Sequence, residues 1–306
     1  MQKFTVRDFN RIFPDDDACL DAIRDLIYPD GIACRKCGEV TKHHRLRNRK
    51  AYSCDQCGTH VYPLAGTILE KSSTPLKSWI YAMYLMASTR TGISAKQLER
   101  ELGVTYKTAW RIFKQVRALL SEDVGPSAGS LELDESYFGG KDKNRHESKR
   151  THAGRGRGAG GKTIVMGVAK RGGWVSAQVV PNVKASTLLP IVREKVLPAS
   201  MVYTDEFVVY GALTRMGYQH KRVHHEAKVY VAGDAHTNTL EGFWSLVKRG
   251  ISGVNHAVSA KYLQTYLDEF AFRTSHRKDE QPMFTTFLNR VGIVRAGQYG
   301  AYAPLH

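Results

Sequence analysis

Long apolar runs are missing from this sequence, because no stretch of 18 consecutive apolar residues occurs among its 306 positions. A helix that spans a membrane needs about 20 such residues, so we expect no membrane span and no membrane partner. The first residues, MQKFTVRDF, also lack the apolar core of a secretory signal peptide. We therefore expect a soluble, cytoplasmic protein.

Acidic residues are scarce relative to basic ones: 29 Asp and Glu stand against 45 Lys and Arg, a formal net charge of +16. Such an excess is expected of a protein that binds the phosphates of nucleic acid. A basic surface that serves solubility, or one that lies on a membrane, is the alternative. The aromatic content, with 15 Tyr, 11 Phe and 4 Trp, excludes global disorder.

Cysteine is scarce too, but four of the five cysteines form two CxxC pairs. Cys34 and Cys37 make one pair, and after sixteen residues Cys54 and Cys57 make the other. This spacing is typical of a zinc ribbon, in which four thiolates close a tetrahedral site around one structural zinc ion. Two disulfides or a redox dithiol are the alternatives, and disulfides suit neither a cytosolic chain nor this spacing. We predict a zinc ribbon over residues 31–65, after a helical segment over residues 1–30.

Residues 74–120 carry a helix-turn-helix pattern. Ser94 and Thr105 are favoured caps for two short helices, and Gly103 lies between them where the chain turns. A helical hairpin that only separates its neighbours is the alternative. On the second helix, four side chains are expected to face the major groove or the phosphates of double-stranded DNA: Tyr106, Lys107, Arg111 and Lys114.

A short linker over residues 121–129 precedes a strand over residues 131–137, and a glycine-rich basic segment then follows. Residues 139–162 hold eight Lys or Arg, two Asp or Glu and seven Gly, a local net charge of eight minus two, or +6. This composition cannot form a packed core. It predicts a basic arm that binds DNA phosphates through residues such as Lys141, Arg155 and Arg157.

Three acidic residues occupy positions that suit a metal site. Asp134 and Asp205 each follow a short apolar run, as at the end of a buried strand, and Glu241 falls in the first turn of an amphipathic helix. Carboxylate oxygens hold hard divalent cations, so the pattern suits two metal ions. Lys248 comes seven residues after Glu241, which puts it about 20° off the same helix face.

The order of these acids, with 35 residues between Asp205 and Glu241, resembles the DDE transposases. The segments LDESYFGGK and HTNTLEGFWSLVKRG resemble, more narrowly, the ISXO-like group of bacterial insertion-sequence transposases. The resemblance implies an α/β protein in which the zinc ribbon and helix-turn-helix precede an RNase H-like mixed-sheet catalytic domain, over residues 130–290, and a tail over 291–306. It also implies that Asp134, Asp205 and Glu241 hold two Mg²⁺ ions, with Mn²⁺ as a substitute, and that Lys248 and Arg249 position a phosphate.

The third acidic position has alternatives. Asn238 and Glu241 fit a capping box, in which the asparagine caps the helix and the glutamate reaches back to the cap amide. The family also varies at this position, so Asn238 and His236 remain candidates beside Glu241. Asp134 and Glu135 are adjacent and point to opposite faces of a strand, so only one is a primary ligand. The family motif D-E-x-x-x-G-G-K favours Asp134.

The resemblance implies a transposase that binds the terminal inverted repeats of an insertion sequence and then cuts and joins DNA by metal-dependent phosphoryl transfer. Its partners would be those ends, the target DNA and at least one further copy of the chain, since two ends must be brought together. It would act at the nucleoid of a bacterium. Two alternatives are a catalytically inactive DNA-binding regulator derived from a transposase and a nuclease of the same fold. Such a nuclease does not predict the zinc ribbon and helix-turn-helix.

Overall fold

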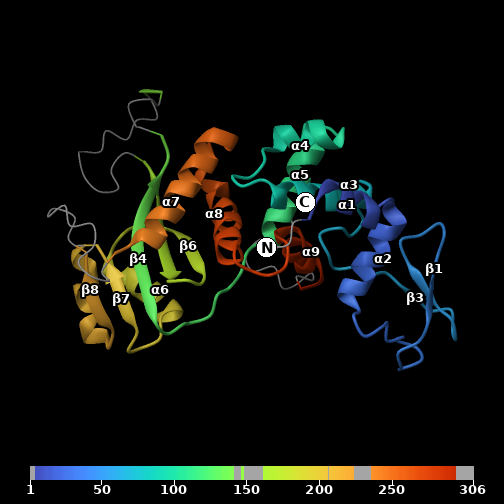
Figure 1. Ribbon diagram of the computed structural model, residues 1–306, viewed down its shortest axis with the longest axis horizontal. Helices are drawn as coiled ribbons and strands as arrows, with labels where there is room; N and C mark the ends of the chain where they lie inside the picture. Colours follow the sequence, from blue (N-terminus) through green and yellow to red (C-terminus); the bar gives the residue numbers. More distant parts are fainter. Residues whose placement is uncertain (1–3, 141–145, 148–160, 206, 224–235, 294–306) are drawn as a thin grey trace. The chain divides into compact units, whose positions relative to one another are not determined.

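A computed structural model describes residues 4–140, 146–147, 161–205, 207–223 and 236–293. The described residues fall into two compact units (Figure 1). One unit comprises Met1–Leu120 and Lys278–His306, and the other comprises Ser121–Arg277. In the described part of the chain no helix is long and apolar enough to cross a membrane.

The first unit is helical around an aromatic core. It contains α1 (Val6–Ile12), α2 (Asp16–Ile27), α3 (Leu76–Ser88), α4 (Ala95–Leu102), α5 (Tyr106–Leu119) and α9 (Met283–Ile293). Asp15 accepts a hydrogen bond from the Ala18 amide and so caps α2. The ring of Phe284 on α9 lies against Phe9 and Tyr84. This packing joins a C-terminal helix to the N-terminal helices.

The same unit holds a small antiparallel sheet in the order β1 (His43–Arg45), β2 (Tyr52–Cys54) and β3 (His60–Val61). Tyr52 is buried and hydrogen-bonds Asp21 of α2 through its hydroxyl. Arg45 also forms ion pairs with Asp17 and Asp21 of that helix. The sheet is therefore fixed to α2 by one buried aromatic side chain and by ion pairs.

The second unit is built on a mixed sheet with the strand order β6-β5-β4-β7-β8. Its strands are β4 (Ser130–Phe138), β5 (Thr163–Lys170), β6 (Val175–Val180), β7 (Met201–Thr204) and β8 (Gln219–Arg222). Strands β4, β5 and β6 pair antiparallel, whereas β7 and β8 run parallel to β4. The tight turn between β5 and β6 uses Gly172 at φ +73°, a left-handed conformation that favours glycine. Three antiparallel strands followed by two parallel strands are the arrangement expected for an RNase H-like domain.

Helices cover both faces of this sheet (Figure 1). On one face, α7 (Asn238–Gly250) and α8 (Ala260–Ser275) bury Leu240, Phe243, Trp244 and Leu267 against β4, β5 and β6. On the other face, α6 (Ala185–Lys195) and the 3₁₀ helices η3 (Val208–Ala212) and η4 (Thr214–Met216) bury a second cluster. Side chains alternate between the faces along β4, so Leu131 and Leu133 belong to the α6 side and Asp134 to the α7 side.

The outer edge of β6 is bonded to α8 by side chains. The amide of Val179 donates to Oε1 of Gln264 at 2.8 Å, and Nε2 of Gln264 donates to the carbonyl of Ala177 at 2.8 Å. The amide of Val175 donates to Oγ of Ser275 at 3.0 Å. Helix α8 therefore bonds three of the backbone groups of β6 that face away from β5.

The predicted domain limits differ from this division at two places. The expected linker, residues 121–129, belongs to the second unit, where Ser127 bridges Val196 and Lys195 forms an ion pair with Asp123 at 2.7 Å. Residues 278–290, expected in the catalytic domain, belong to the first unit.

Candidate functional site

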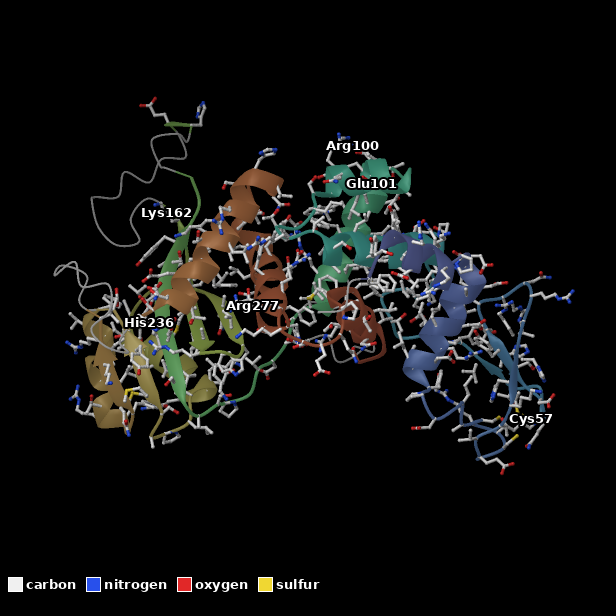
Figure 2. The ribbon with its side chains drawn as sticks, in the orientation of Figure 1. Cys57, Arg100, Glu101, Lys162, His236 and Arg277 are labelled. Atoms are coloured by element: carbon white, nitrogen blue, oxygen red, sulfur yellow. The ribbon has the colours of Figure 1, made fainter. Side chains whose placement is uncertain are left out.

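The four ribbon cysteines meet at one point. Their sulfur atoms lie within 4.8 Å of one another, with 3.5 Å between Cys34 and Cys57 and 3.9 Å between Cys37 and Cys54. A tetrahedral zinc ion with zinc–sulfur bonds of about 2.3 Å requires sulfur separations of roughly 3.8 Å. Cys57 is labelled in Figure 2. The cluster therefore has the size of a closed zinc site.

The backbone and the hydroxyls around the cysteines also suit a metal. Gly38 and Gly58 have φ values of +80° and +70°, and their amides donate to the carbonyls of Cys34 and Cys54. The hydroxyls of Thr41 and Thr59 lie 3.2 Å from the sulfurs of Cys54 and Cys57. Hydrogen bonding with Thr59 lowers the pKa of Cys57 to about 6, and Thr41 lowers the pKa of Cys54. Thiolates, which zinc needs as ligands, are thus favoured at Cys54 and Cys57, whereas hydrogen bonding with Cys57 raises the pKa of Cys37.

The helix-turn-helix consists of α4 and α5. Ser94 and Thr105 cap them, and Gly103 ends α4 at φ +62°. Tyr106 and Lys107 are exposed at the start of α5, and Lys114 is half-buried. Arg111 is exposed but donates to the Thr74 hydroxyl at 3.0 Å and lies over the Trp79 ring. Arg111 therefore contributes to the packing of α5 on α3, in addition to any role at the helix surface.

The three predicted carboxylates come from three different elements of the second unit. Asp134 lies in the middle of β4, in agreement with the strand predicted over residues 131–137, and not at the end of a strand as its apolar run alone suggests. Asp205 directly follows β7, and its Oδ1 accepts from the Phe207 amide. Glu241 lies in the first turn of α7, as the periodicity predicts.

Both oxygens of Asp134 are held by hydrogen bonds. Its Oδ2 accepts from the indole Nε1 of Trp244 at 2.9 Å, and its Oδ1 accepts from the Glu135 amide at 2.9 Å. Burial and then the charge of Asp205 raise the pKa of Asp134 to about 6, and Glu241 acts in the same direction. The two hydrogen bonds oppose this rise. The carboxyl is thus held in one orientation, and its surroundings penalise its negative charge.

Asp134 opens onto a cavity of about 470 Å³. Its lining residues are Asp134, Glu135, Ser136, Glu241, Trp244, Ser245, Lys248 and Arg249. Lys248 and Arg249 are exposed, and Nζ of Lys248 lies 5.9 Å from the centre of the Phe138 ring. Two carboxylates of the predicted triad therefore share a cavity with two cations, the charge pattern needed to hold metal ions and a phosphate together.

Asp205 is not among the residues that line this cavity, although its charge acts on Asp134. Within the described parts of the chain, only the four cysteines bring three or more ligand atoms within 4.8 Å of one another. The three carboxylates thus influence one another's charge but are not gathered into a closed ligand set. Their chemistry fits hard divalent cations, which would draw the oxygen atoms together.

The N-terminus of α7 differs from the predicted capping box. The cap residue is Thr237, and Asn238 is the first helical residue and is exposed. Oε1 of Glu241 accepts from the Thr237 hydroxyl at 2.8 Å. The free amides of the first turn are bonded by the carboxylate of Glu132, a residue of β4 that is 0% exposed. A buried acid from the sheet thus takes the place of a local cap.

The other predicted site residues lie around this centre or outside the described residues. The ring of His236, labelled in Figure 2, lies 3.5 Å from Glu132 and 3.3 Å from Arg171. Glu135 bonds the buried Tyr210 hydroxyl on the face away from α7. Lys141, Arg155 and Arg157 fall outside the described residues.

Sequence reasoning missed four residues that shape the site: Glu132, Gly167, Arg171 and Trp244. Gly167 pairs with Asp134 across β4 and β5, and a methyl group there would approach the Trp244 ring to 2.5 Å. The indole can reach Asp134 because position 167 has no side chain. Glu132 could have been found, because an acid two residues before Asp134 in an apolar strand must share its face.

Comparisons with known proteins show what this chain is similar to. The ISXO2-like transposase domain matches residues 126–275, and the transposase zinc-ribbon domain matches residues 14–60. An "Uncharacterized protein in transposable element ISH50" of Halobacterium salinarum is 30% identical over 271 residues, which cover 85% of this chain and 91% of that protein. An "Uncharacterized transposase-like protein" of Haemophilus influenzae is 38% identical over 95 residues, or 31% of this chain and 76% of that protein. Among solved structures, a pre-cleavage Mos1 transpososome matches 70% of this chain and 78% of that chain at 13% identity, with a TM-score of 0.28.

Proposed function

Because the chain belongs to the ISXO2-like transposase family, we propose that it is an active transposase that cuts and joins DNA at the ends of its insertion sequence. The observation that carries the proposal is the cavity that Asp134 and Glu241 line together with Lys248 and Arg249. Asp205 and Glu241, from β7 and α7, both raise the pKa of Asp134 on β4. Acidic side chains from separate elements that act on one another's charge in a partly buried site are costly unless a cation compensates them.

Asp134, Asp205 and Glu241 are the proposed ligands of two Mg²⁺ ions, for which Mn²⁺ can substitute. When bound, such ions polarise the phosphoryl group and lower the pKa of an attacking water. The side chains of the protein have separate tasks. Trp244 keeps Asp134 in one orientation, and Lys248 and Arg249 attract and position a DNA phosphate in the cavity.

Recognition of the inverted repeats is assigned to the first unit. The exposed residues Tyr106 and Lys107 of α5 would contact the DNA, and the zinc ribbon would add a second contact. At least two copies of the chain would act together, because a transposase joins two ends to one target. The proposed place of action is the chromosome, in the nucleoid of the bacterial cytoplasm.

The proposal is tested by metal-dependent nicking and strand transfer with DNA that carries the flanking inverted repeats. Glu241→Gln should lower both rates by orders of magnitude, because the amide no longer carries the charge that holds a hard cation. Binding of the ends and folding should barely change, because a glutamine oxygen can still accept from the Thr237 hydroxyl.

Asn238→Ala is the matched control, since Asn238 lies on the same helical turn, is exposed, and caps nothing. It should keep normal strand transfer. If Glu241→Gln keeps near-normal activity while Asn238→Ala is folded but inactive, Asn238 and not Glu241 would be the third metal ligand. A wild-type protein that binds the ends but never nicks them would favour the alternative of an inactive regulator.

A further inference from the structure

A buried polar network lies beneath the three predicted carboxylates. Its centre is Glu132, which is 0% exposed, with Nε of Arg171 at 3.0 Å from its Oε1. A fully buried carboxylate is costly unless it is paired and hydrogen-bonded. Glu132 is both, because it also accepts from the hydroxyl and amide of Thr239 and from the amide of Leu240.

The network touches each element that carries a predicted metal ligand. Glu132 lies on β4 two residues before Asp134, and Thr239 lies on α7 two residues before Glu241. The guanidinium of Arg171 lies 3.7 Å from the centre of the Tyr203 ring, two residues before Asp205 on β7. Glu132 and Tyr203 are also direct partners in the β4–β7 pairing.

Arg171 fixes the approach to α7 as well. Its NH2 group donates to the His236 carbonyl at 2.5 Å, and its backbone amide donates to the Ser130 carbonyl at 3.0 Å. The segment that enters α7 is thereby bonded to the end of β5 and to the start of β4. A shift of α7 along the sheet would break the bonds of Glu132 and the bond to His236 together.

From this geometry we infer that Glu132 and Arg171 are positioning residues, which hold β4, β7 and α7 in the register that lets Asp134, Asp205 and Glu241 bind one pair of divalent cations. The inference rests on the proposed function and extends it to the residues that support the three proposed ligands. The pair is not among the residues that line the cavity of Asp134 and Glu241. It acts through the three elements, in the way that outer hydrogen-bond partners orient the ligands of metal sites.

The test measures the affinity of the full-length, zinc-loaded protein for Mn²⁺ by electron paramagnetic resonance. Glu132→Gln should weaken Mn²⁺ binding by about 10- to 100-fold, the usual effect of losing an outer hydrogen-bond partner. Amide exchange at Thr239 and Leu240 should become faster. Zinc content and binding of DNA ends should stay as in the wild type.

Two further variants separate positioning from stability. Glu132→Gln removes the carboxylate that compensates the partly buried charge of Arg171, which should lower stability. Adding Arg171→Met removes that charge, so the double variant should regain stability while its Mn²⁺ binding stays weak. Glu269→Gln removes another buried acid, which pairs with Arg273 on α8 at 2.6 Å. This control should lose stability and keep Mn²⁺ binding.

Unchanged Mn²⁺ affinity in Glu132→Gln, or an equal loss in Glu269→Gln, would overturn the inference. A wild-type protein that binds no Mn²⁺ would overturn the inference and the two-metal proposal together. A wild-type protein that binds Mn²⁺ but does not nick DNA would count against the proposed function alone. The comparison of Mn²⁺ affinities would then still decide the role of Glu132.

Discussion

The side chain of Asp134 is ionised at neutral pH in surroundings that penalise its charge, because burial and Asp205 raise its pKa from 3.8 to about 6. Between these values the folded protein binds more protons than the unfolded chain, so its stability falls as the pH rises through this window. Asp134→Asn removes the penalty. Without divalent metal it should raise the free energy of unfolding by about 1–3 kcal/mol at pH 7.5 and by little at pH 4, as measured by urea denaturation.

Asp268→Asn is the control for Asp134→Asn. Burial raises the pKa of Asp268 to about 6 as well, and its Oδ1 accepts from Gln264 on the same helix. Both substitutions should therefore stabilise the metal-free protein at pH 7.5. Added Mn²⁺ should stabilise the wild type and Asp268→Asn but not Asp134→Asn. Equal stabilisation of all three proteins by Mn²⁺ would contradict the assignment of Asp134 as a ligand.

Gly167 on β5 lies directly against Trp244 and Leu240 of α7. A methyl group there would meet the Trp244 ring at 2.5 Å and Leu240 at 2.9 Å, so the helix must shift to admit it. Gly167→Ala should lower the free energy of unfolding by about 1–3 kcal/mol, the usual cost of overpacking. Gly242→Ala is a control with the opposite expected sign. Gly242 lies within α7 and a methyl group there would meet open space, so alanine should stabilise the helix by about 0.5–1 kcal/mol. Chemical denaturation of both variants measures whether the free energy of unfolding falls in Gly167→Ala and rises in Gly242→Ala.

The start of α7 shows what local sequence rules could and could not predict at the scale of one element. The helix, its apolar face and the place of Glu241 in its first turn follow from periodicity. The capping box is wrong because the amides at the helix start bond Glu132, a residue more than a hundred positions earlier in the chain. Capping rules consider only neighbours in sequence, so they could not find this partner. The four cysteines, by contrast, were predictable because CxxC spacing alone brings both thiols of a pair to one turn.

The zinc ribbon should depend on its metal. Cys54→Ser should lower the zinc content from about one per chain to near zero, since structural zinc supplies about 10–16 kcal/mol of binding free energy to small modules. The ribbon should unfold locally while the mixed sheet keeps its own thermal transition. Elemental analysis and calorimetry measure both effects. Cys19→Ala is the control, because Cys19 is buried outside the cluster and should leave the zinc content unchanged.

Helix α5 offers a clean test of DNA binding at Lys107. This side chain is exposed, whereas Arg111 bonds Thr74 and packs on Trp79, so its removal would also disturb the fold. Lys107→Ala should weaken binding of the ends and reduce the slope of log affinity against log salt by about 1. Arg11→Ala removes an exposed cation from α1 and should leave both quantities unchanged. Equal losses in the two variants would indicate a general charge effect instead of a contact by α5.

Over the whole chain, the order of modules was predictable, but the limits of the compact units were not. Helix α9 lies with α2 and α3 because Phe284 fits among Phe9 and Tyr84, a packing that sequence distance conceals. Segment 121–129 has the composition of a linker. It belongs to the second unit because the Leu197 amide donates to the Ser127 carbonyl and Lys195 pairs with Asp123. Such long-range contacts leave no mark on local composition.

The net charge of +16 predicts that the protein binds DNA of any sequence, with an affinity that falls steeply as the salt concentration rises. Deleting residues 141–162, most of which fall outside the described residues, should flatten this dependence, since each lost phosphate contact removes roughly 0.9 from the slope. Affinity for unrelated DNA should fall, while recognition of the inverted repeats over other sequences is retained. Titrations at several salt concentrations measure the slope. Identical slopes with and without the segment would contradict its role as an arm that binds DNA phosphates.

The side chains of α8 that bond the outer edge of β6 have a consequence for contacts between copies of the chain at high concentration. An unpaired strand edge invites a strand from a neighbouring chain, which leads to intermolecular sheets and aggregation. Gln264 and Ser275 already bond the amides of Val175 and Val179 and the carbonyl of Ala177, so an incoming strand would have to displace these side chains to pair in register. Copies gathered at high local concentration are thereby protected at this edge from sticking to one another irreversibly.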